Sequence, residues 1–257
     1  MAIVTLLTDS GESDHYIASI KARILSVNPD VRIVDISHHI RLFDIGHAAF
    51  VLRSVFHQFA KGTIHLVGVD SAGNRGDAFI IMLLDDHYFV GCDNGLFSLL
   101  SQKLPEKIWQ INVESPILTT FPELEIFSEA AARLSAGQAP DALGKPLTAL
   151  KRLTDRQVKA TRKQITGHII RVDNFGNLIT NIPKQAFDTM SKGREYTILF
   201  GGEKFRRIFT LYNQAELGEI FIVFNNLEFL EIGIYKGNAS ELLGLGYDSV
   251  VNIVFEE

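Results

Sequence analysis

Short apolar runs rich in β-branched residues alternate with segments of helical periodicity throughout the first half of the sequence. The predicted strands are residues 2–7, 31–36, 62–69, 78–84, 88–90 and 107–112, and the predicted helices are residues 15–27, 45–59, 96–102 and 126–134. The fourth and fifth strands form a predicted hairpin around Asp85 and Asp86. Because strands that alternate with helices usually run in one direction, this order predicts an α/β domain with a largely parallel, helix-covered sheet.

The second half of the sequence has a different pattern. Its predicted elements are strands only, residues 165–172, 196–200, 220–224, 229–234 and 250–254, separated by Gly and Asn turns. Residues 151–164 are dense in Lys, Arg, Asp and Thr and lack an apolar face, which is typical of a linker. We therefore predict an α/β N-terminal domain over residues 1–150, a linker over 151–164, and a small all-β, barrel-like C-terminal domain over 165–257.

The amino-acid composition of the chain argues against several classes of binding partner. No apolar run approaches the ~20 residues that span a bilayer, so no membrane segment is predicted. A formal net charge of −5 argues against nucleic acid, which is bound through Lys and Arg. No secretory signal is visible and Cys92 is the only cysteine, so we expect a cytoplasmic protein without an intramolecular disulfide or a thiolate metal cluster. A small, cationic ligand fits this composition better.

Two aspartates directly follow predicted strands. Asp9 comes after the first strand and Asp70 after the third. Ligands of parallel sheets bind outside the carboxyl ends of the strands, so these two carboxylates are candidates for one shared crevice. Taken singly, each is more simply interpreted as the cap of a turn or helix.

A group of histidines near residue 40 raises the question of a metal site. His38, His39 and His47, together with Asp44, are residue types that bind zinc or iron. However, His38 and His39 diverge on an extended backbone, and Asp44 is the predicted N-cap of the helix that carries His47. We therefore favour histidines that order the loop and predict no metal. The sequence also lacks a phosphate-binding glycine motif and a G-x-S-x-G elbow.

The stretch from Asp173 to Asn177 lies between two β runs in the second half. An exposed Asp, Phe and Asn in one turn can stack on a base and hydrogen-bond to it. The alternative is an ordinary turn with Phe175 packed into the barrel.

Several of these blocks occur in the same order in one known family. They are Thr8–Gly11 with Asp14 and Tyr16, Val34–His38, Phe43–Ile45, Tyr88–Gly95, Asp173–Asn181, Gly237–Ala239 and Gly246–Val250. Together they resemble the S-adenosylmethionine (SAM) hydroxide adenosyltransferase family, which is related to the fluorinase and chlorinase. The resemblance extends over nearly the whole chain.

This resemblance implies a homotrimer with adenosyl sites between the N-domain of one subunit and the C-domain of its neighbour. It implies no cofactor other than the substrate SAM itself. The residues implied to bind ligand are Asp9 for the ribose hydroxyls, Phe43 for the pocket wall, Asp173, Phe175 and Asn177 for the methionine or adenine end, and Asn226 near the base.

The implied reaction is attack of water or hydroxide on the 5′ carbon of SAM, which releases methionine and leaves adenosine. The family uses an Asp, an Arg and a His for this step. Asp70 matches the Asp, whereas Arg75 matches the Arg only if the loop is shorter, since a gapless alignment places Asp77 there. Pro122 stands at the position of the His and has no titratable group, so His87 or another residue has to substitute for it.

These departures leave three hypotheses. The first is a SAM hydrolase in which Asp70 orients water and Arg75 assists. The second is a trimer that binds adenosine or SAM but has lost or altered its catalysis. The third is a reaction with another nucleophile, such as a halide, because a fold does not specify the nucleophile.

Overall fold

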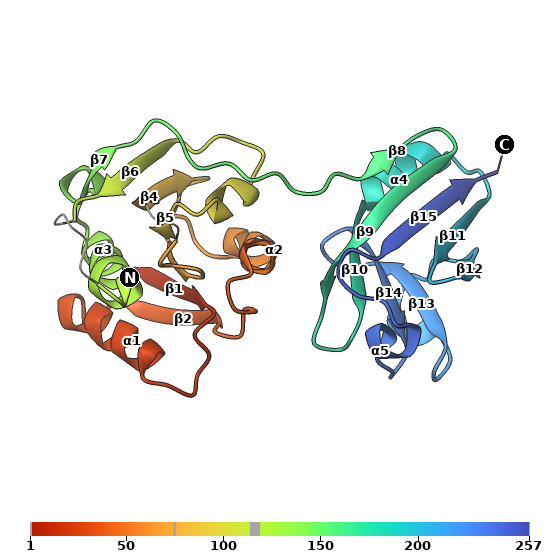
Figure 1. Ribbon diagram of the computed structural model, residues 1–257, viewed down its shortest axis with the longest axis horizontal. Coiled ribbons are helices and arrows are strands. Elements are labelled where there is room, and N and C mark those ends of the chain that lie inside the picture. The colour runs from red at the N-terminus through yellow and green to blue at the C-terminus, as the bar shows by residue number, and fades with distance from the viewer. Residues whose placement is uncertain (1, 74–75, 114–118, 257) are drawn as a thin grey trace. The chain divides into compact units, whose positions relative to one another are not determined.

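The computed structural model describes residues 2–73, 76–113 and 119–256. The chain divides into two compact units, Met1–Thr154 and Asp155–Glu257, each with its own hydrophobic core. Figure 1 shows helices packed on the sheet of the first unit and a mostly β second unit. Within the described residues, no helix is long and apolar enough to cross a membrane.

The first unit is built on a seven-stranded sheet in the order β2-β1-β3-β5-β4-β6-β7. The strands are β1 (Ile3–Thr8), β2 (Arg32–Ser37), β3 (Ile64–Gly68), β4 (Phe79–Leu84), β5 (His87–Cys92), β6 (Lys107–Ile111) and β7 (Gly144–Pro146). The helices are α1 (Tyr16–Val27), α2 (Ile45–Val55) and α3 (Ser128–Ser135), with short helical segments η1 (Phe56–Gln58), η2 (Leu96–Leu99), η3 (Glu123–Phe127) and η4 (Pro140–Ala142).

The prediction of a largely parallel sheet holds for one side of this sheet. Strands β2, β1, β3 and β5 run parallel to one another, whereas β4, β6 and β7 pair antiparallel. The predicted hairpin between β4 and β5 is confirmed. Asp85 and Asp86 both have positive φ, 50° and 64°, which suits a two-residue turn that follows the twist of the strands.

Helices cover both faces of the sheet because successive strand residues point to opposite sides. Leu6 of β1 packs in one core with Ile20 of α1 and the alanines of α3. Leu7 belongs to the core on the other face, together with Leu52 of α2. Figure 1 shows α1 and α3 on one side of the sheet and α2 on the other. Because β1 and β3 pair in parallel, their carboxyl ends lie along one edge of the sheet.

The second unit is an eight-stranded antiparallel sheet in the order β12-β11-β15-β9-β10-β14-β13, with β8 paired to β9. Its strands are β8 (Lys159–Ala160), β9 (Gln164–Val172), β10 (Leu178–Pro183), β11 (Tyr196–Phe200), β12 (Glu203–Phe205), β13 (Ile220–Phe224), β14 (Phe229–Ile234) and β15 (Val250–Phe255). It also contains α4 (Lys184–Ser191), η5 (Tyr212–Gln214) and α5 (Ala239–Leu243).

Strand β9 gives this sheet its curl. Its residues 164–168 pair with β15, and Ile169, Arg171 and Val172 pair with β10. The sheet therefore folds around an apolar core as a half-barrel. The five predicted strands of this half are confirmed, whereas α4 and α5 were not predicted, because eight and five residues are too short for a clear helical period.

The segment predicted as a linker begins on the first unit. Residues 151–158 contain no helix or strand. The backbone N–H of Lys151 donates to both carboxylate oxygens of Asp93 at 3.1 Å, and that of Leu153 donates to Ser98 Oγ at 2.9 Å. Lys151 is thereby fixed beside the strand ends of the first unit.

Candidate active site

Asp9 and Asp70 lie together where two neighbouring parallel strands, β1 and β3, end. The carboxylate oxygen Oδ2 of Asp9 accepts a hydrogen bond from the backbone N–H of Asp70 at 3.4 Å and from that of Phe43 at 2.9 Å. The Asp9 carboxylate thus joins three segments that are distant in sequence. This contact places the first of the predicted site residues at one edge of the sheet.

Phe43 has an unusual backbone for an aromatic residue. Its φ is 61°, and its side chain is 70% exposed. A bulky residue in the left-handed region costs about 1–3 kcal/mol, and such strain clusters at ligand sites. The hydrogen bond to Asp9 holds this conformation and leaves the ring available to a ligand.

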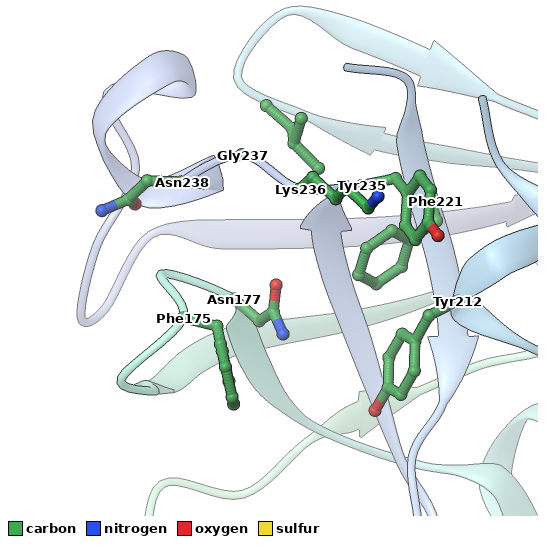
Figure 2. A pocket seen from close by; sticks show the side chains of 9 residues that line it. Phe175, Asn177, Tyr212, Phe221, Tyr235, Lys236, Gly237 and Asn238 are labelled. Atoms are coloured by element: carbon green, nitrogen blue, oxygen red, sulfur yellow. The ribbon is translucent and has the colours of Figure 1, made fainter. Parts of the chain in front are cut away.

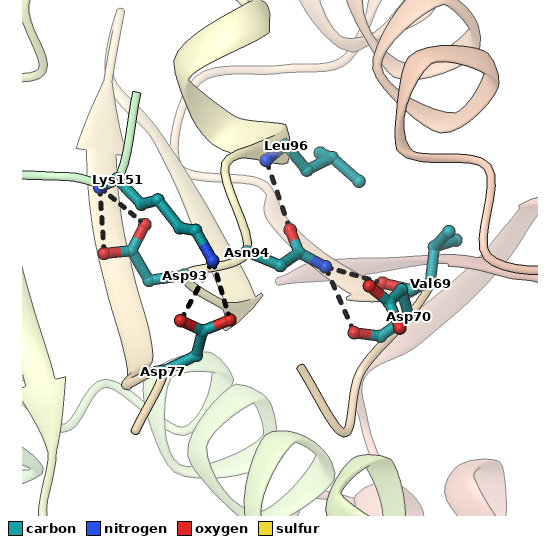
Figure 3. A network of polar contacts seen from close by, with 7 residues as sticks. All are labelled: Val69, Asp70, Asp77, Asp93, Asn94, Leu96 and Lys151. Carbon is teal, nitrogen blue, oxygen red and sulfur yellow. Dashed lines mark hydrogen bonds and ion pairs between the residues drawn. The ribbon is translucent and has the colours of Figure 1, made fainter. Parts of the chain in front are cut away.

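Asp70 also lies in the left-handed region, with φ of 46°. Asn94 clamps this turn, because its Nδ2 donates to the carbonyl oxygens of Val69 at 3.0 Å and Asp70 at 3.1 Å (Figure 3). Burial raises the pKa of the Asp70 carboxyl, and the negative charges of Asp9 and Asp77 add to this shift. Asp70 is therefore a more basic carboxylate than an exposed aspartate, which suits a strong hydrogen bond from a bound water.

A lysine supplies positive charge at this edge of the sheet. Lys151 Nζ lies 3.0 Å from both carboxylate oxygens of Asp77, which follows the Asp70 loop (Figure 3). The Lys151 charge opposes the upward shift in the pKa of Asp70. Arg75, the predicted catalytic arginine, lies outside the described residues. Sequence reasoning missed Lys151, because the linker pattern around it gave no indication of a site.

Glu123 was also missed, although it follows Pro122 directly. It begins the π-helical segment η3, is only 7% exposed, and accepts a hydrogen bond from the hydroxyl of Ser71, the residue after Asp70. Burial raises the pKa of its carboxyl. The one available signal was a carboxylate next to the position of the family histidine.

His87 does not reach this site. It is the first residue of β5, which runs parallel to β3, so it lies at the opposite edge of the sheet from Asp70. There it is buried against His65, with 3.2 Å between Nε2 of His65 and Nδ1 of His87. The hypothesis that His87 replaces the family histidine is therefore wrong.

The histidines near residue 40 order the loop that carries Phe43. His38 Nδ1 lies 2.9 Å from Thr8 Oγ1, and His47 Nδ1 accepts the backbone N–H of Arg41 at 3.0 Å. Asp44 is the N-cap of α2, as predicted, and accepts the backbone N–H of His47 at 2.9 Å. In the part of the chain that the structure describes, no three His, Cys, Asp or Glu side chains gather as a metal site.

The second unit carries a separate candidate binding site at the turn between β9 and β10. Asp173 Oδ1 accepts the backbone N–H groups of Phe175 at 2.9 Å and Asn177 at 2.8 Å. This fixes the turn and leaves Phe175 76% exposed, so the alternative in which its ring packs into the barrel is wrong. Gly176 has to lack a side chain, because a Cβ there would lie 2.0 Å from Asn238 Oδ1.

A cavity of about 600 Å³ opens beside this turn (Figure 2). Aromatic rings and amides line much of it, among them Phe175, Tyr212, Phe221, Tyr235, Asn177 and Asn238. A mixture of aromatic faces and amide groups suits a flat, hydrogen-bonding ligand such as a nucleobase. Asn226 is exposed in the turn between β13 and β14 and is not among the lining residues.

Beside this cavity, the buried carboxyl of Glu231 binds several of its neighbours. Asn225 Nδ2 donates to Glu231 Oε2 at 2.9 Å, and Tyr212 and Asn177 also hydrogen-bond to this carboxyl. Burial raises the pKa of Glu231, and burial together with Glu231 raises the pKa of Tyr212 to about 12. The Tyr212 hydroxyl therefore stays protonated and remains a donor.

Comparison with known protein families matches both units. Residues 4–144 match the SAM hydroxide adenosyltransferase N-terminal domain, and residues 167–252 match the corresponding C-terminal domain. The chain belongs to the SAM hydroxide adenosyltransferase family. Among curated members, it is 32% identical over 267 residues to (R)-S-adenosyl-L-methionine hydrolase of Methanocaldococcus jannaschii, with 98% of this chain and 96% of the relative covered.

Two further similar proteins match nearly the whole chain. The (R)-S-adenosyl-L-methionine hydrolase of Thermus thermophilus is 28% identical over 263 residues, which cover 95% of this chain and 96% of the relative. The crystal structure of an uncharacterized conserved protein from Thermotoga maritima is 27% identical, has a TM-score of 0.88, and is matched over 99% of this chain and 100% of its own.

Proposed function

We propose that this chain hydrolyses SAM to adenosine and L-methionine. Two relatives that align with nearly its whole length are named as hydrolases of the (R) form of SAM. The observation that carries the proposal at the site is Asp70, a carboxylate of raised pKa held at a strand end by Asn94 and Asp9.

Because the sulfonium of SAM is a good leaving group, the protein has to supply little chemistry of its own for hydrolysis. The water oxygen forms a bond to the 5′ carbon while the bond from that carbon to sulfur breaks, and the electron pair goes to sulfur. The sulfonium becomes a neutral thioether, and the attacking water loses a proton. The protein therefore has to aim one water in line with the leaving sulfur, exclude bulk solvent and accept that proton. Asp70 orients the water in this proposal, because its carboxylate accepts a hydrogen bond from that water.

Substrate binding uses residues from both units in this proposal. In the first unit, Asp9 holds the ribose hydroxyls and Phe43 lines the pocket. In the second unit, Asp173, Phe175 and Asn177 hold the methionine or adenine end, and Asn226 lies near the base. The two exposed phenylalanines support this assignment, since large aromatic side chains that face solvent commonly mark binding surfaces. SAM is the substrate, and no further cofactor is proposed.

We further propose that the chain works as a homotrimer in the cytoplasm and binds neither nucleic acid nor membrane. The trimer is what the sequence resemblance to this family implies, and the net charge of −5 supports the absence of nucleic acid. Size-exclusion chromatography with light scattering measures the assembly directly. A mass close to that of one 28.7 kDa chain would contradict the trimer.

The test of function is incubation of the purified protein with SAM, followed by chromatography for adenosine and methionine. The ribose and L-methionine centres are fixed, so the (R) in the relatives' name describes sulfur, and the two sulfur epimers are supplied separately. We expect adenosine and methionine from the (R) epimer with wild type, and at least ~100-fold less with Asp70→Asn.

Two other outcomes would decide for the alternatives. Tight adenosine binding in calorimetry without product would favour a binding protein that has lost its chemistry. A halogenated adenosine formed only when chloride is added would favour a different nucleophile. Equal rates for wild type and Asp70→Asn would remove Asp70 from the mechanism.

A further inference from the structure

The carboxyl side chain of Glu123 is inserted between β3 and the loop that follows Asp70. It is 7% exposed, and its Cγ lies so close to β3 that a Cβ on Gly68 would approach it to 2.7 Å. Gly68 has no side chain, and it is this absence that admits Glu123. The Glu123 carboxylate is therefore held in a buried position, although burial disfavours the charged form of a carboxyl group.

The segment that presents Glu123 is unusual and firmly held. It begins with a π-helical turn, a rare geometry that is frequent at functional sites. The carbonyl oxygen of Phe121 accepts the N–H groups of Leu124 and Glu125, both at 3.1 Å. The Phe121 ring packs edge-on against Tyr16 of α1, with 5.1 Å between ring centroids. These contacts fix the direction of the Glu123 side chain.

The carboxylate of Glu123 is bound to Ser71. A serine hydroxyl has one proton, and here that proton is donated to Glu123 Oε1. The free lone pairs of Ser71 Oγ can then only accept, so they favour a donor such as water. Ser71 directly follows Asp70, and Asp9 is the charged group that acts on Glu123. Ser71 and Glu123 therefore belong to the site already described.

We propose that Glu123 is a positioning residue for the hydrolytic water and acts through Ser71. By holding the Ser71 proton, it turns the serine oxygen into an acceptor that orients the water for attack on the 5′ carbon. As that carbon bonds to the water oxygen and releases sulfur, a water proton passes to Ser71 Oγ and the serine proton passes to Glu123. Glu123 thereby restores, by a different residue and route, the proton acceptor that Pro122 cannot supply. This inference rests on the proposed SAM hydrolysis.

The test compares Glu123→Gln with wild type over a range of pH. Glutamine keeps an oxygen that accepts the Ser71 hydroxyl, but it cannot take up the proton at neutral pH. We expect kcat to fall about 100-fold with KM within about 2-fold of wild type. With Asp70 and Glu123 both required as carboxylates, the acidic limb of log kcat has a slope of about two, and Glu123→Gln reduces it to about one.

Three more variants separate positioning from folding. Glu123→Asp keeps the charge and is expected to recover part of the lost rate. Gly68→Ala pushes Glu123 away from Ser71 and is expected to lower kcat without removing any titratable group. Glu125→Gln is the matched control, because Glu125 is exposed in the same helical segment and should leave kcat unchanged.

The outcomes distinguish this inference from the function on which it rests. If wild type releases no adenosine from either epimer, the proposed function fails and the inference with it. If wild type is active and Glu123→Gln keeps its kcat and the slope of its acidic limb, only the inference is overturned. If Glu123→Asp is no better than Glu123→Gln, the charge-dependent role is likewise rejected.

Discussion

The side-chain amide of Asn94 donates to two successive carbonyl oxygens, those of Val69 and Asp70, at 3.0 and 3.1 Å. Its own oxygen accepts the backbone N–H of Leu96 at 3.1 Å. The residue is 4% exposed, so water does not substitute for these bonds. The left-handed backbone of Asp70 is therefore held by a side chain from the neighbouring strand end as well as by its own loop, in which the backbone N–H of Gly73 donates to the Asp70 carbonyl oxygen at 3.0 Å.

Removal of this clamp should cost both stability and activity. Asn94→Ala removes the side-chain donor from both carbonyl groups, of which only that of Asp70 also accepts the N–H of Gly73, so we expect the free energy of unfolding of the first unit to fall by about 1–3 kcal/mol. We expect kcat to fall about 10- to 100-fold, because the Asp70 carboxylate is no longer aimed. Asn94→Asp replaces the donor by an acceptor and should do at least as much harm. Urea unfolding and adenosine release measure the two effects, and an Asn94→Ala enzyme with wild-type kcat would contradict the clamp.

Lys151 should set the pH at which Asp70 becomes active. Its positive charge opposes the upward shift in the Asp70 pKa, so Lys151→Met raises that pKa further. Because the proposed reaction needs Asp70 as a carboxylate, the acidic limb of kcat should move to higher pH. Lys61→Met is the control, since Lys61 pairs instead with Asp86 in the β4–β5 turn. An unmoved limb in Lys151→Met would show that this lysine does not influence Asp70.

Glu123→Gln should be more stable than wild type at pH 7. The Glu123 pKa is raised by burial, so the stability that this residue contributes is present below its ordinary value of 4.5 and is lost as pH rises through the folded-state pKa. Glutamine carries no charge to desolvate, and we expect Tm to rise by a few degrees at pH 7. The advantage should vanish near pH 4, where the carboxyl is protonated in both states. Calorimetric scans at the two pH values check this, and a lower Tm at pH 7 would contradict it.

His65 should make the first unit sensitive to acid. Burial lowers its pKa from 6.5 to about 3, so the imidazole is neutral in the folded state while it protonates in the unfolded state. Stability that is present above pH 6.5 is therefore lost progressively as pH falls toward 3. The urea midpoint of wild type should fall across this window more steeply than that of His65→Asn. His39→Asn, at an exposed position, should follow wild type.

Phe175 should contribute to ligand affinity and not to folding. Its ring is 76% exposed, so Phe175→Ala removes almost no packing. If the ring stacks on adenine, adenosine should bind about 10-fold more weakly, as expected for the loss of one aromatic contact. Leu217→Ala is a matched control in the same unit, because Leu217 is 77% exposed. Titration calorimetry at constant temperature measures both, and equal affinities for the two variants would exclude the stacking role.

Local pattern was sufficient for most of the elements and for the carboxylates at the strand ends. Asp9 and Asp70 were predicted to meet because parallel strands end at one edge, and they do so through the Asp9 carboxylate. The insertion of β4 between β5 and β6 was not predicted, because pairing order is decided by packing across the sheet. The position of the sheet's antiparallel side was therefore missed.

The residues that complete the site could not be predicted, because they lie far apart in the sequence from the residues that they contact. Ser71 and Glu123 are 52 positions apart, and Lys151 and Asp77 are 74 apart. Apart from the place of Glu123 directly after Pro122, nothing in the sequence around Glu123 or Lys151 distinguishes them from solvated charges. His87 was considered because histidine is the usual acceptor, but strand direction places it at the opposite edge of the sheet.

The pairing of β9 with two different partners also governs how the second unit forms. The later half of β9 pairs with β10 across a tight turn, which is a local contact. The earlier half of β9 pairs with β15, which lies more than eighty residues further along the chain, so this pairing forms only after β15 has been synthesised. Strand β15 also joins β11 to the rest of the sheet. During synthesis, the hairpin of β9 and β10 can form early, but its open edge stays exposed until β15 has left the ribosome.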